Sequence, residues 1–222
     1  NAHADSGVAV TAEQNQSTGN ITWGIKTSFR NYIGEPYKVS EGASYNSTDL
    51  FTFPNHEAKV SEAGNQVSLQ GSGKVQYISH CADRNKPEEC SLNLTLSNPR
   101  IEMDAAQGTG TLYMVVRTKN YTSGQWEGPH EIPMAKLSLK TAQQSEKDGV
   151  VTWSNVAANL TAEGNHAFSN FYEDGVGLDA LTFSYSGTKA KDAQNSGYKL
   201  GESLNSGTDI NNPQNTVRAG SY

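Results

Sequence analysis

Two hydroxyl side chains in one short segment could bind a polar or metal-containing ligand. Ser28 and Tyr32 lie four residues apart in the run TWGIKTSFRNYIGEP (22–36), so a helix would place both on one face. A hydroxyl can donate a hydrogen bond to a ligand, and a tyrosine phenolate is a hard oxygen ligand for a metal ion. The pattern alone favours a plainer interpretation, in which Tyr32 belongs to an amphipathic core helix with its hydroxyl at the surface.

Other patterns that carry chemistry are scarce. The sequence has no nucleophile elbow, phosphate-binding loop, HExxH metal motif or GxGxxG fingerprint. His80 ends the run KVQYISH (74–80), where a polar residue at a strand end is the ordinary interpretation. Because the carboxylates are scattered along the chain, an ordinary hydrolase or transferase has little support, and we expect no enzyme activity.

The only two cysteines, Cys81 and Cys90, directly follow His80 and enclose the run ADRNKPEE. Their separation favours a disulfide that closes a small loop, with free thiols as the alternative. A disulfide would imply an oxidising compartment. A zinc site is disfavoured, because the second cysteine or histidine pair of a zinc motif is missing.

Charge and composition exclude several classes of protein. The 222 residues carry a net charge of −6, which argues against a nucleic-acid binder because phosphate binding needs a concentrated basic surface. No run of apolar residues is long enough for a membrane-spanning helix. Only 18% of the residues are charged, and Gly, Ser, Thr and Asn are abundant, which is typical of secreted β-proteins. The first residues, NAHADSGVAVTAEQ, are typical of a mature or trimmed end.

Short strands are the main elements that would position these residues. The alternating run SLNLTLS (91–97) is the clearest half-buried strand. Pro54 is expected to end a strand, and Asn98-Pro99 to turn the chain. Further strands are expected at residues 7–11, 67–70, 74–80, 100–103, 111–117, 132–139, 150–153 and 178–185. Strands at this spacing without a βαβ rhythm predict a mainly β fold, an antiparallel β-sandwich or β-roll with two short α-helices.

Capping residues indicate where the two helices lie. The first is expected between Thr22, as its N-cap, and Gly34 and Pro36, which would end it. The second is expected to follow Thr161, through the run AEGNHAFSNFYEDG (162–175).

Four blocks of this sequence resemble one known family. The blocks are WGIKTSFRNYI (23–33), GKVQYISH (73–80), LNLTLSNPRI (92–101) and FSNFYEDGVGLDALTFS (168–184). In this order they resemble the haem-transport-associated domain, the HtaA-type conserved region of surface haem-uptake proteins in corynebacteria and related Gram-positive actinobacteria. On this basis we expect a haem-binding domain at 20–186, an N-terminal extension at 1–19 and a polar C-terminal linker or stalk at 187–222.

A site for ferric haem is implied by this resemblance. It places the iron-ligating tyrosine at Tyr32 and the histidine that hydrogen-bonds this tyrosine at His80. Ser28 matches a polar residue at the haem edge. Phe29 lies on the neighbouring helical stripe, where it would give the porphyrin an apolar contact.

An aromatic pair completes the implied pocket, with Phe171 and Tyr172 matching the residues that line it. The family usually continues from the histidine through a short glycine-containing turn, whereas CADRNKPEEC (81–90) follows here. The orientation of His80 therefore depends on this loop, which is also a candidate protein contact.

Partners and alternatives follow from the same resemblance. The expected function is capture of ferric haem, from haemoglobin or other host haemoproteins, at the outer face of the cell envelope. The haem would pass to the binding lipoprotein of a haem importer, and a haem-mediated homodimer is a further expectation. Two alternatives stay open: a β-sandwich haemoglobin-binding or adhesion module in which haem is secondary, and a tyrosinate-ligated haem enzyme, for which no distal acid–base pair is identified.

Overall fold

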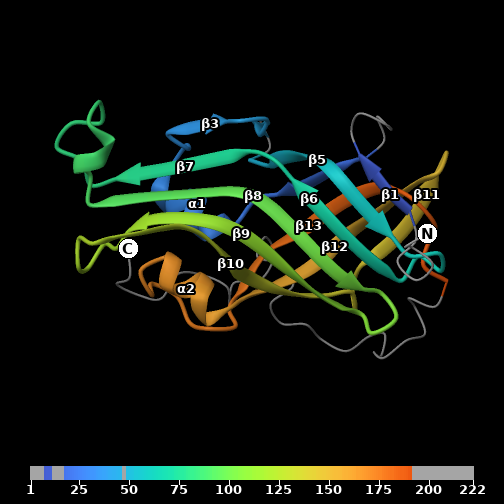
Figure 1. The fold of residues 1–222 in the computed structure, drawn as a ribbon. Coiled ribbons are helices and arrows are strands. Elements are labelled where there is room, and N and C mark those ends of the chain that lie inside the picture. Colours follow the sequence, from blue (N-terminus) through green and yellow to red (C-terminus); the bar gives the residue numbers. More distant parts are fainter. Residues whose placement is uncertain (1–7, 12–17, 47–48, 192–222) are drawn as a thin grey trace.

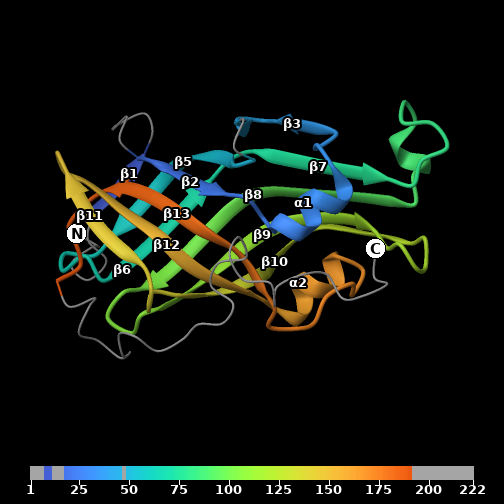
Figure 2. The ribbon, with the colours of Figure 1, turned by 180° about the vertical axis from the view of Figure 1, so that it is seen from behind.

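The computed structural model describes residues 8–11, 18–46 and 49–191. Their strands form a single antiparallel sheet of 13 strands, with two helices toward one end (Figures 1 and 2). The strands are β1 Val8–Thr11, β2 Asn20–Trp23, β3 Lys38–Ser40, β4 Ser44–Tyr45, β5 Phe51–Val60, β6 Gln66–Gly71, β7 Lys74–Ser79, β8 Leu92–Asp104, β9 Thr109–Lys119, β10 Trp126–Ser138, β11 Gln143–Lys147, β12 Val150–Leu160 and β13 Gly177–Ser186. The predicted mainly β, antiparallel fold with two helices is confirmed.

The sheet closes on itself through β6. Neighbouring strands follow the order β1-β5-β2-β13-β12-β10-β9-β8-β7-β3, and β6 pairs with both β5 and β8. Because side chains alternate between the two faces of a strand, the closed sheet encloses the hydrophobic core. Trp23, Trp153 and Phe183 are each only 1% exposed there. The indole nitrogen of Trp153 donates to the hydroxyl of Tyr185 at 2.8 Å, which satisfies its buried polar group.

Two prolines lie inside strands that they were expected to end. In β5, the backbone nitrogen of Asn55 donates to the oxygen of Gly19, so the nitrogen of Pro54 faces the opposite side. On that side the pairing with β4 has ended and the pairing with β6 has not begun. In β8, Pro99 lies within a register shift of the pairing with β9. Neither proline removes a ladder hydrogen bond, so both strands continue.

The first helix is shorter than predicted. Helix α1 spans Thr27–Ile33, whereas Asn20–Trp23 forms β2, which lies between β13 and β5 and buries alternate residues. Thr22 is therefore a strand residue and not the helix cap. Ile25, at φ 69°, separates the strand from the helix. Gly34, at φ 87°, ends α1 as predicted.

Thr161 caps the second helix as predicted. Helix α2 spans Ala162–Ala167, and the Thr161 hydroxyl accepts a hydrogen bond from the backbone nitrogen of Gly164 at 2.9 Å. Ser169 and Asn170 have φ of 58° and 59°, which end the helical path. The predicted continuation of the helix to residue 175 is therefore wrong.

Replacing Thr161 by alanine should lower the free energy of unfolding by about 1 kcal/mol, the usual cost of losing an N-cap. The hydroxyl also donates to the backbone oxygen of Pro133 in β10, so its loss loosens α2 from the sheet. Urea denaturation followed by circular dichroism measures the change. Thr122→Ala, in an exposed loop, is the control, and equal destabilisation by both variants would contradict the capping role.

The described part of the predicted C-terminal linker packs on the domain. Ala190 is 4% exposed. Its nitrogen donates to the side-chain oxygen of Gln144 at 2.7 Å, and its oxygen accepts from the side-chain nitrogen of Gln144 at 3.1 Å. Residues 192–222 and most of the predicted extension at 1–19 lie outside the described residues, so the domain limits stay a prediction. Within the described residues, no helix is long and apolar enough to cross a membrane.

Candidate functional site

Helix α1 is fastened to strand β13 by one buried carboxylate. Asp179, whose side chain is 2% exposed, accepts hydrogen bonds from the backbone nitrogen and the hydroxyl of Thr27, both at 2.9 Å. Its second oxygen pairs with the Arg30 guanidinium at 2.7 Å. Lys26, the N-cap residue, provides no side-chain cap. The carboxylate of Asp179, which lies in β13, caps the helix instead, because it accepts a hydrogen bond from a backbone nitrogen of the first helical turn.

Gly24 leaves the space that this pair needs. A β-carbon at Gly24 would lie 2.4 Å from a carboxylate oxygen of Asp179 and 2.8 Å from the Arg30 guanidinium. Arg30 also donates to the backbone oxygen of Gly24 at 2.6 Å. The glycine therefore belongs to a tight strand-to-helix connection, which explains a residue that would be unfavourable inside a helix.

The inner face of α1 belongs to the core. Phe29 is 1% exposed and meets Tyr77 of β7 and Phe168 edge to face, with ring centroids 5.0 and 5.2 Å apart. Tyr172 is also 1% exposed, packs edge to face on Phe168 and lies beneath the ammonium group of Lys26. These contacts hold α1 against β7 and the segment that follows α2.

Tyr32 lies one turn beyond Ser28, at the outer end of α1, and is 39% exposed. Its hydroxyl oxygen lies 3.2 Å from Nε2 of His80, and the two rings are stacked with centroids 6.3 Å apart. His80 follows the last residue of β7 and has φ 57°. The left-handed conformation interrupts the strand alternation, which would otherwise place His80 on the face opposite Tyr77 and α1. The structure thus brings together the two residues that the sequence resemblance paired.

A row of aromatic rings extends from Tyr32 across the surface. The ring of His80 meets Tyr121 edge to face at 5.0 Å, and Tyr121 meets Phe171 at 5.5 Å. Tyr121, like Tyr32, is more than one-third exposed. Its backbone nitrogen donates to the hydroxyl of Ser169 at 2.9 Å, which fixes the loop after β9 to the segment after α2. We call Tyr32, His80, Tyr121 and Phe171 the aromatic row.

A narrow crevice lies beside this row, between α1, β8, β9 and the segment after α2. Its volume is about 10 Å³, far below that of a usual ligand pocket. It is lined by Phe29, Leu92, Leu94, Thr118, Lys119, Ala167, Phe168, Ser169 and Phe171. Of the predicted aromatic pair, Phe171 lines this crevice, whereas Tyr172 packs in the core. Ser28 is half-buried on α1, four residues before Tyr32.

A larger cavity of about 290 Å³ lies under α2. Thr118 and Ala167 line both this cavity and the crevice, and the Thr118 hydroxyl donates to the backbone oxygen of Ala167 at 3.2 Å. At its rim, Nε2 of His166 lies 2.8 Å from a carboxylate oxygen of Glu127. Among the described residues, no group of three or more His, Cys, Asp or Glu side chains is arranged to hold a metal ion.

Two other tyrosines near α1 are unsuited to act as phenolates. Burial, followed by the hydrogen bond to the Asp49 carboxylate, raises the pKa of Tyr45 to about 12. Burial likewise raises the pKa of Tyr77, which is completely covered. Both keep their protons at neutral pH. The exposed phenols beside the His80 imidazole are those of Tyr32 and Tyr121, and the hydroxyl of Tyr32 lies within hydrogen-bonding distance of Nε2.

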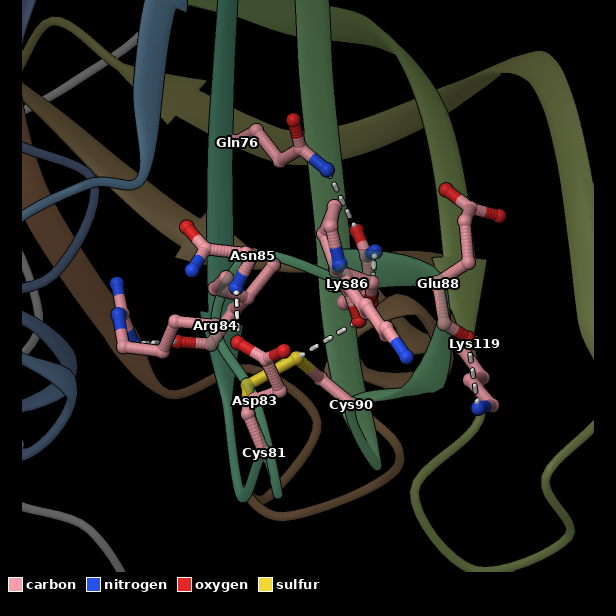
Figure 3. Close-up of a disulfide and its surroundings, with 12 residues drawn as sticks. Gln76, Cys81, Asp83, Arg84, Asn85, Lys86, Glu88, Cys90 and Lys119 are labelled. Carbon is pink, nitrogen blue, oxygen red and sulfur yellow. Dashed lines mark hydrogen bonds between the residues drawn. A yellow bond between two sulfur atoms is a disulfide. The ribbon is translucent and has the colours of Figure 1, made fainter.

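The predicted disulfide is present between Cys81 and Cys90 (Figure 3). Cys90 is fully buried, and between the cysteines lies a short 3-10 helix, Pro87–Glu89. The backbone nitrogen of Ser91 donates to the oxygen of His80 at 3.0 Å, which closes the base of the loop. The loop therefore begins and ends next to the site.

The family model of HtaA matches residues 18–184 of this sequence. This chain belongs to the HtaA family. The HtaA match runs from β2 into β13, of which it omits the last two residues, and includes both helices, the aromatic row and the disulfide loop. No curated protein matches the sequence.

Three solved structures from Corynebacterium glutamicum resemble this HtaA domain. The C-terminal domain of HtaA is 20% identical, with a TM-score of 0.62 over 76% of this chain and 95% of that one. The N-terminal domain of HtaA is 24% identical, with a TM-score of 0.58 over 77% and 97%. The heme binding protein HtaB is 22% identical, with a TM-score of 0.59 over 81% and 94%. At these identities the similarity shows a shared fold.

Two parts of this HtaA site had no signal in the sequence. Tyr121 lies in the loop NYTSG, which has the composition of an ordinary turn, and only the approach of the segment after α2 gives it a place in the row. Asp179 lies in an apolar strand pattern, and its pairing with Arg30 spans 149 positions. Long-range pairs of this kind leave no local periodicity.

Proposed function

We propose that this HtaA domain binds ferric haem, with the phenolate of Tyr32 as the iron ligand and His80 as its hydrogen-bond donor. The observation that carries the proposal is the 3.2 Å contact between the Tyr32 hydroxyl and Nε2 of His80 at an exposed surface. Family membership supports it, as does the fold shared with a protein named as heme binding.

The residue types suit ferric iron. A phenolate is a hard anionic ligand that favours Fe(III) over Fe(II). Because the pKa of free tyrosine is about 10, the phenol needs help to ionise at neutral pH. The charge of the bound iron supplies most of that help, and a hydrogen bond from the imidazole stabilises the anion further.

The surroundings of Tyr32 suit a flat apolar ligand. Tyr121 and Phe171 present aromatic surface beside the Tyr32–His80 pair, and Phe29 lines the adjoining crevice. The crevice is too narrow for a porphyrin, so haem must lie against the aromatic row or the segment 168–171 must move. The hydroxyl oxygens of Ser28 and Tyr172 are both buried, so Ser28 would serve the polar edge of the ligand, and Tyr172 would contact haem, only after such a movement.

A single strong ligand suits a protein that passes haem onward, because it leaves the other side of the iron open. We infer that the domain works at the outer face of the cell envelope, takes haem from haemoglobin or another host haemoprotein and delivers it to the binding lipoprotein of a haem importer. A homodimer bridged by haem would be compatible with one exposed ligand for each copy.

Hemin titration tests the proposal. The purified protein should show a Soret band that saturates at one haem per chain for a monomer, or at one haem per two chains for a haem-bridged homodimer, with the absorption features of ferric iron. Transfer from methaemoglobin is followed by the same spectra after the proteins are separated. A protein whose spectrum stays that of free hemin would refute haem binding.

Replacing His80 by alanine should speed haem loss by about 10-fold, because outer-shell partners of a metal ligand typically contribute 10- to 100-fold in affinity. Transfer of haem to excess apomyoglobin, followed at the Soret band, measures the rate. His56→Ala, at an exposed position of β5, is the matched control and should release haem as the wild type does. An unchanged rate in His80→Ala would limit His80 to a structural role.

A further inference from the structure

The backbone of His80 is held in an uncommon conformation. Its φ of 57° lies in the left-handed region, which residues with a β-carbon rarely adopt unless the surrounding structure imposes it. This conformation directs the imidazole toward Tyr32.

The side-chain contacts of His80 are weak restraints. Tyr32 and Tyr121, its two ring neighbours, are 39% and 37% exposed. Exposed side chains keep much of their rotamer freedom, so a hydrogen bond and a ring contact at the surface do not by themselves fix an imidazole. The restraint has to come from the backbone on either side.

On the C-terminal side, the disulfide supplies that restraint. Cys81 is the next residue after His80, and its bond to Cys90 places Ser91 beside His80. The backbone nitrogen of Ser91 donates to the backbone oxygen of His80 at 3.0 Å. His80 is thus enclosed by the last residue of β7, the disulfide and this hydrogen bond. We call residues 81–90 the clipped loop.

The clipped loop is itself docked on the sheet. Asn93 of β8, completely buried, donates through its side-chain nitrogen to the oxygen of Pro87 at 3.0 Å. The ammonium group of Lys119 donates to the oxygen of Glu88 at 3.2 Å (Figure 3). Arg84 reaches back to the oxygen of Ile78 in β7 at 3.4 Å. These contacts fix the loop to β7, β8 and β9, so the disulfide has a rigid support.

We propose that the Cys81–Cys90 disulfide is a positioning element that holds His80 against Tyr32 and so controls how tightly the phenolate retains its ligand. The part that concerns haem rests on the proposed function, whereas the part that concerns His80 does not. Reduction by a dithiol adds two electrons and two protons to the sulfur–sulfur bond, leaves two thiols, and converts the dithiol to its own disulfide. A reductant at the cell surface would thereby loosen the site without contacting the ligand.

A double-mutant cycle tests the proposal. Wild type, His80→Ala, the pair Cys81→Ser and Cys90→Ser, and the triple variant are loaded with hemin and mixed with apomyoglobin. The cysteine pair should release haem several-fold faster, approaching the roughly 10-fold effect expected of His80→Ala. The triple variant should release haem no faster than His80→Ala alone. Release by the cysteine pair at the wild-type rate, or effects that multiply in the triple variant, would overturn the proposal.

A second measurement needs neither haem nor a variant that has to fold. The ring nitrogens of His80 are followed by nuclear magnetic resonance in the ligand-free wild type before and after reduction with tris(2-carboxyethyl)phosphine. Reduction should shift the His80 signals as its contact with Tyr32 is lost, while those of His56 stay in place as an internal control. Unmoved His80 signals in the reduced protein would overturn the proposal. A wild type that binds no hemin but shows the shift would refute the proposed function and keep the positioning role.

Discussion

Replacing Tyr32 by phenylalanine is expected to abolish the phenolate-to-iron charge-transfer band and to weaken hemin binding by at least about 100-fold, more than an outer-shell partner contributes. The substitution removes one oxygen atom and keeps the ring, so its packing on His80 is retained. The expected loss of hemin affinity therefore measures the bond between the phenolate and the iron, and not a change in the fold. Absorption spectra and hemin titration measure the two effects.

Tyr37→Phe is the matched control for this experiment. Tyr37 is 38% exposed and Tyr32 is 39% exposed, and both lie close together in the chain. Tyr37, however, stacks near the Arg84 guanidinium and lies outside the aromatic row. Hemin binding by Tyr37→Phe should equal that of the wild type. An intact charge-transfer band and affinity in Tyr32→Phe would show that another residue binds the iron.

Replacing Asp179 by asparagine should lower the free energy of unfolding by about 3 kcal/mol, because it leaves the Arg30 guanidinium without its buried partner. The new amide also brings a donor toward groups that are themselves donors, the nitrogen and hydroxyl of Thr27. Chemical denaturation measures the loss. Since α1 carries Tyr32, the variant should also release haem faster than the wild type.

A surface pair provides the control for Asp179. Glu102 pairs with Arg100 at 2.8 Å, but its side chain is 43% exposed. Exposed ion pairs contribute at most about 1 kcal/mol, so Glu102→Gln should have a small effect on stability. If Asp179→Asn were no more destabilising than Glu102→Gln, the contact of α1 with Asp179 of β13 would not be what holds the helix in place.

The site combines rigid support with an exposed ligand. Asp179 binds the start of α1, Phe29 packs the inner face of the helix into the core, and the clipped loop is the proposed restraint on His80. Tyr32 is left accessible between these supports. In the proposed function, this arrangement would hold haem in a defined geometry and still leave it accessible to a partner.

Local patterns in the sequence determined much of the fold. Alternation in SLNLTLS and the capping hydroxyl of Thr161 predicted elements that the structure contains, because strand faces and helix caps depend on near neighbours in the chain. The resemblance of the four blocks to the family predicted a contact between Tyr32 and His80, and their side chains lie within hydrogen-bonding distance. The spacing of the two cysteines favoured a disulfide over free thiols, and the disulfide is present.

Tertiary structure alone decided how these parts meet. Thr22 was expected to cap the first helix but lies in β2, because insertion between β13 and β5 outweighs local preference. Asp179 pairs with Arg30 of α1 although 149 positions separate them in the chain. Tyr121 joins the aromatic row through its hydrogen bond to the segment after α2. His80 turns its ring toward Tyr32 because its own backbone is left-handed. Each of these depends on contacts between residues far apart in sequence, which no local pattern records.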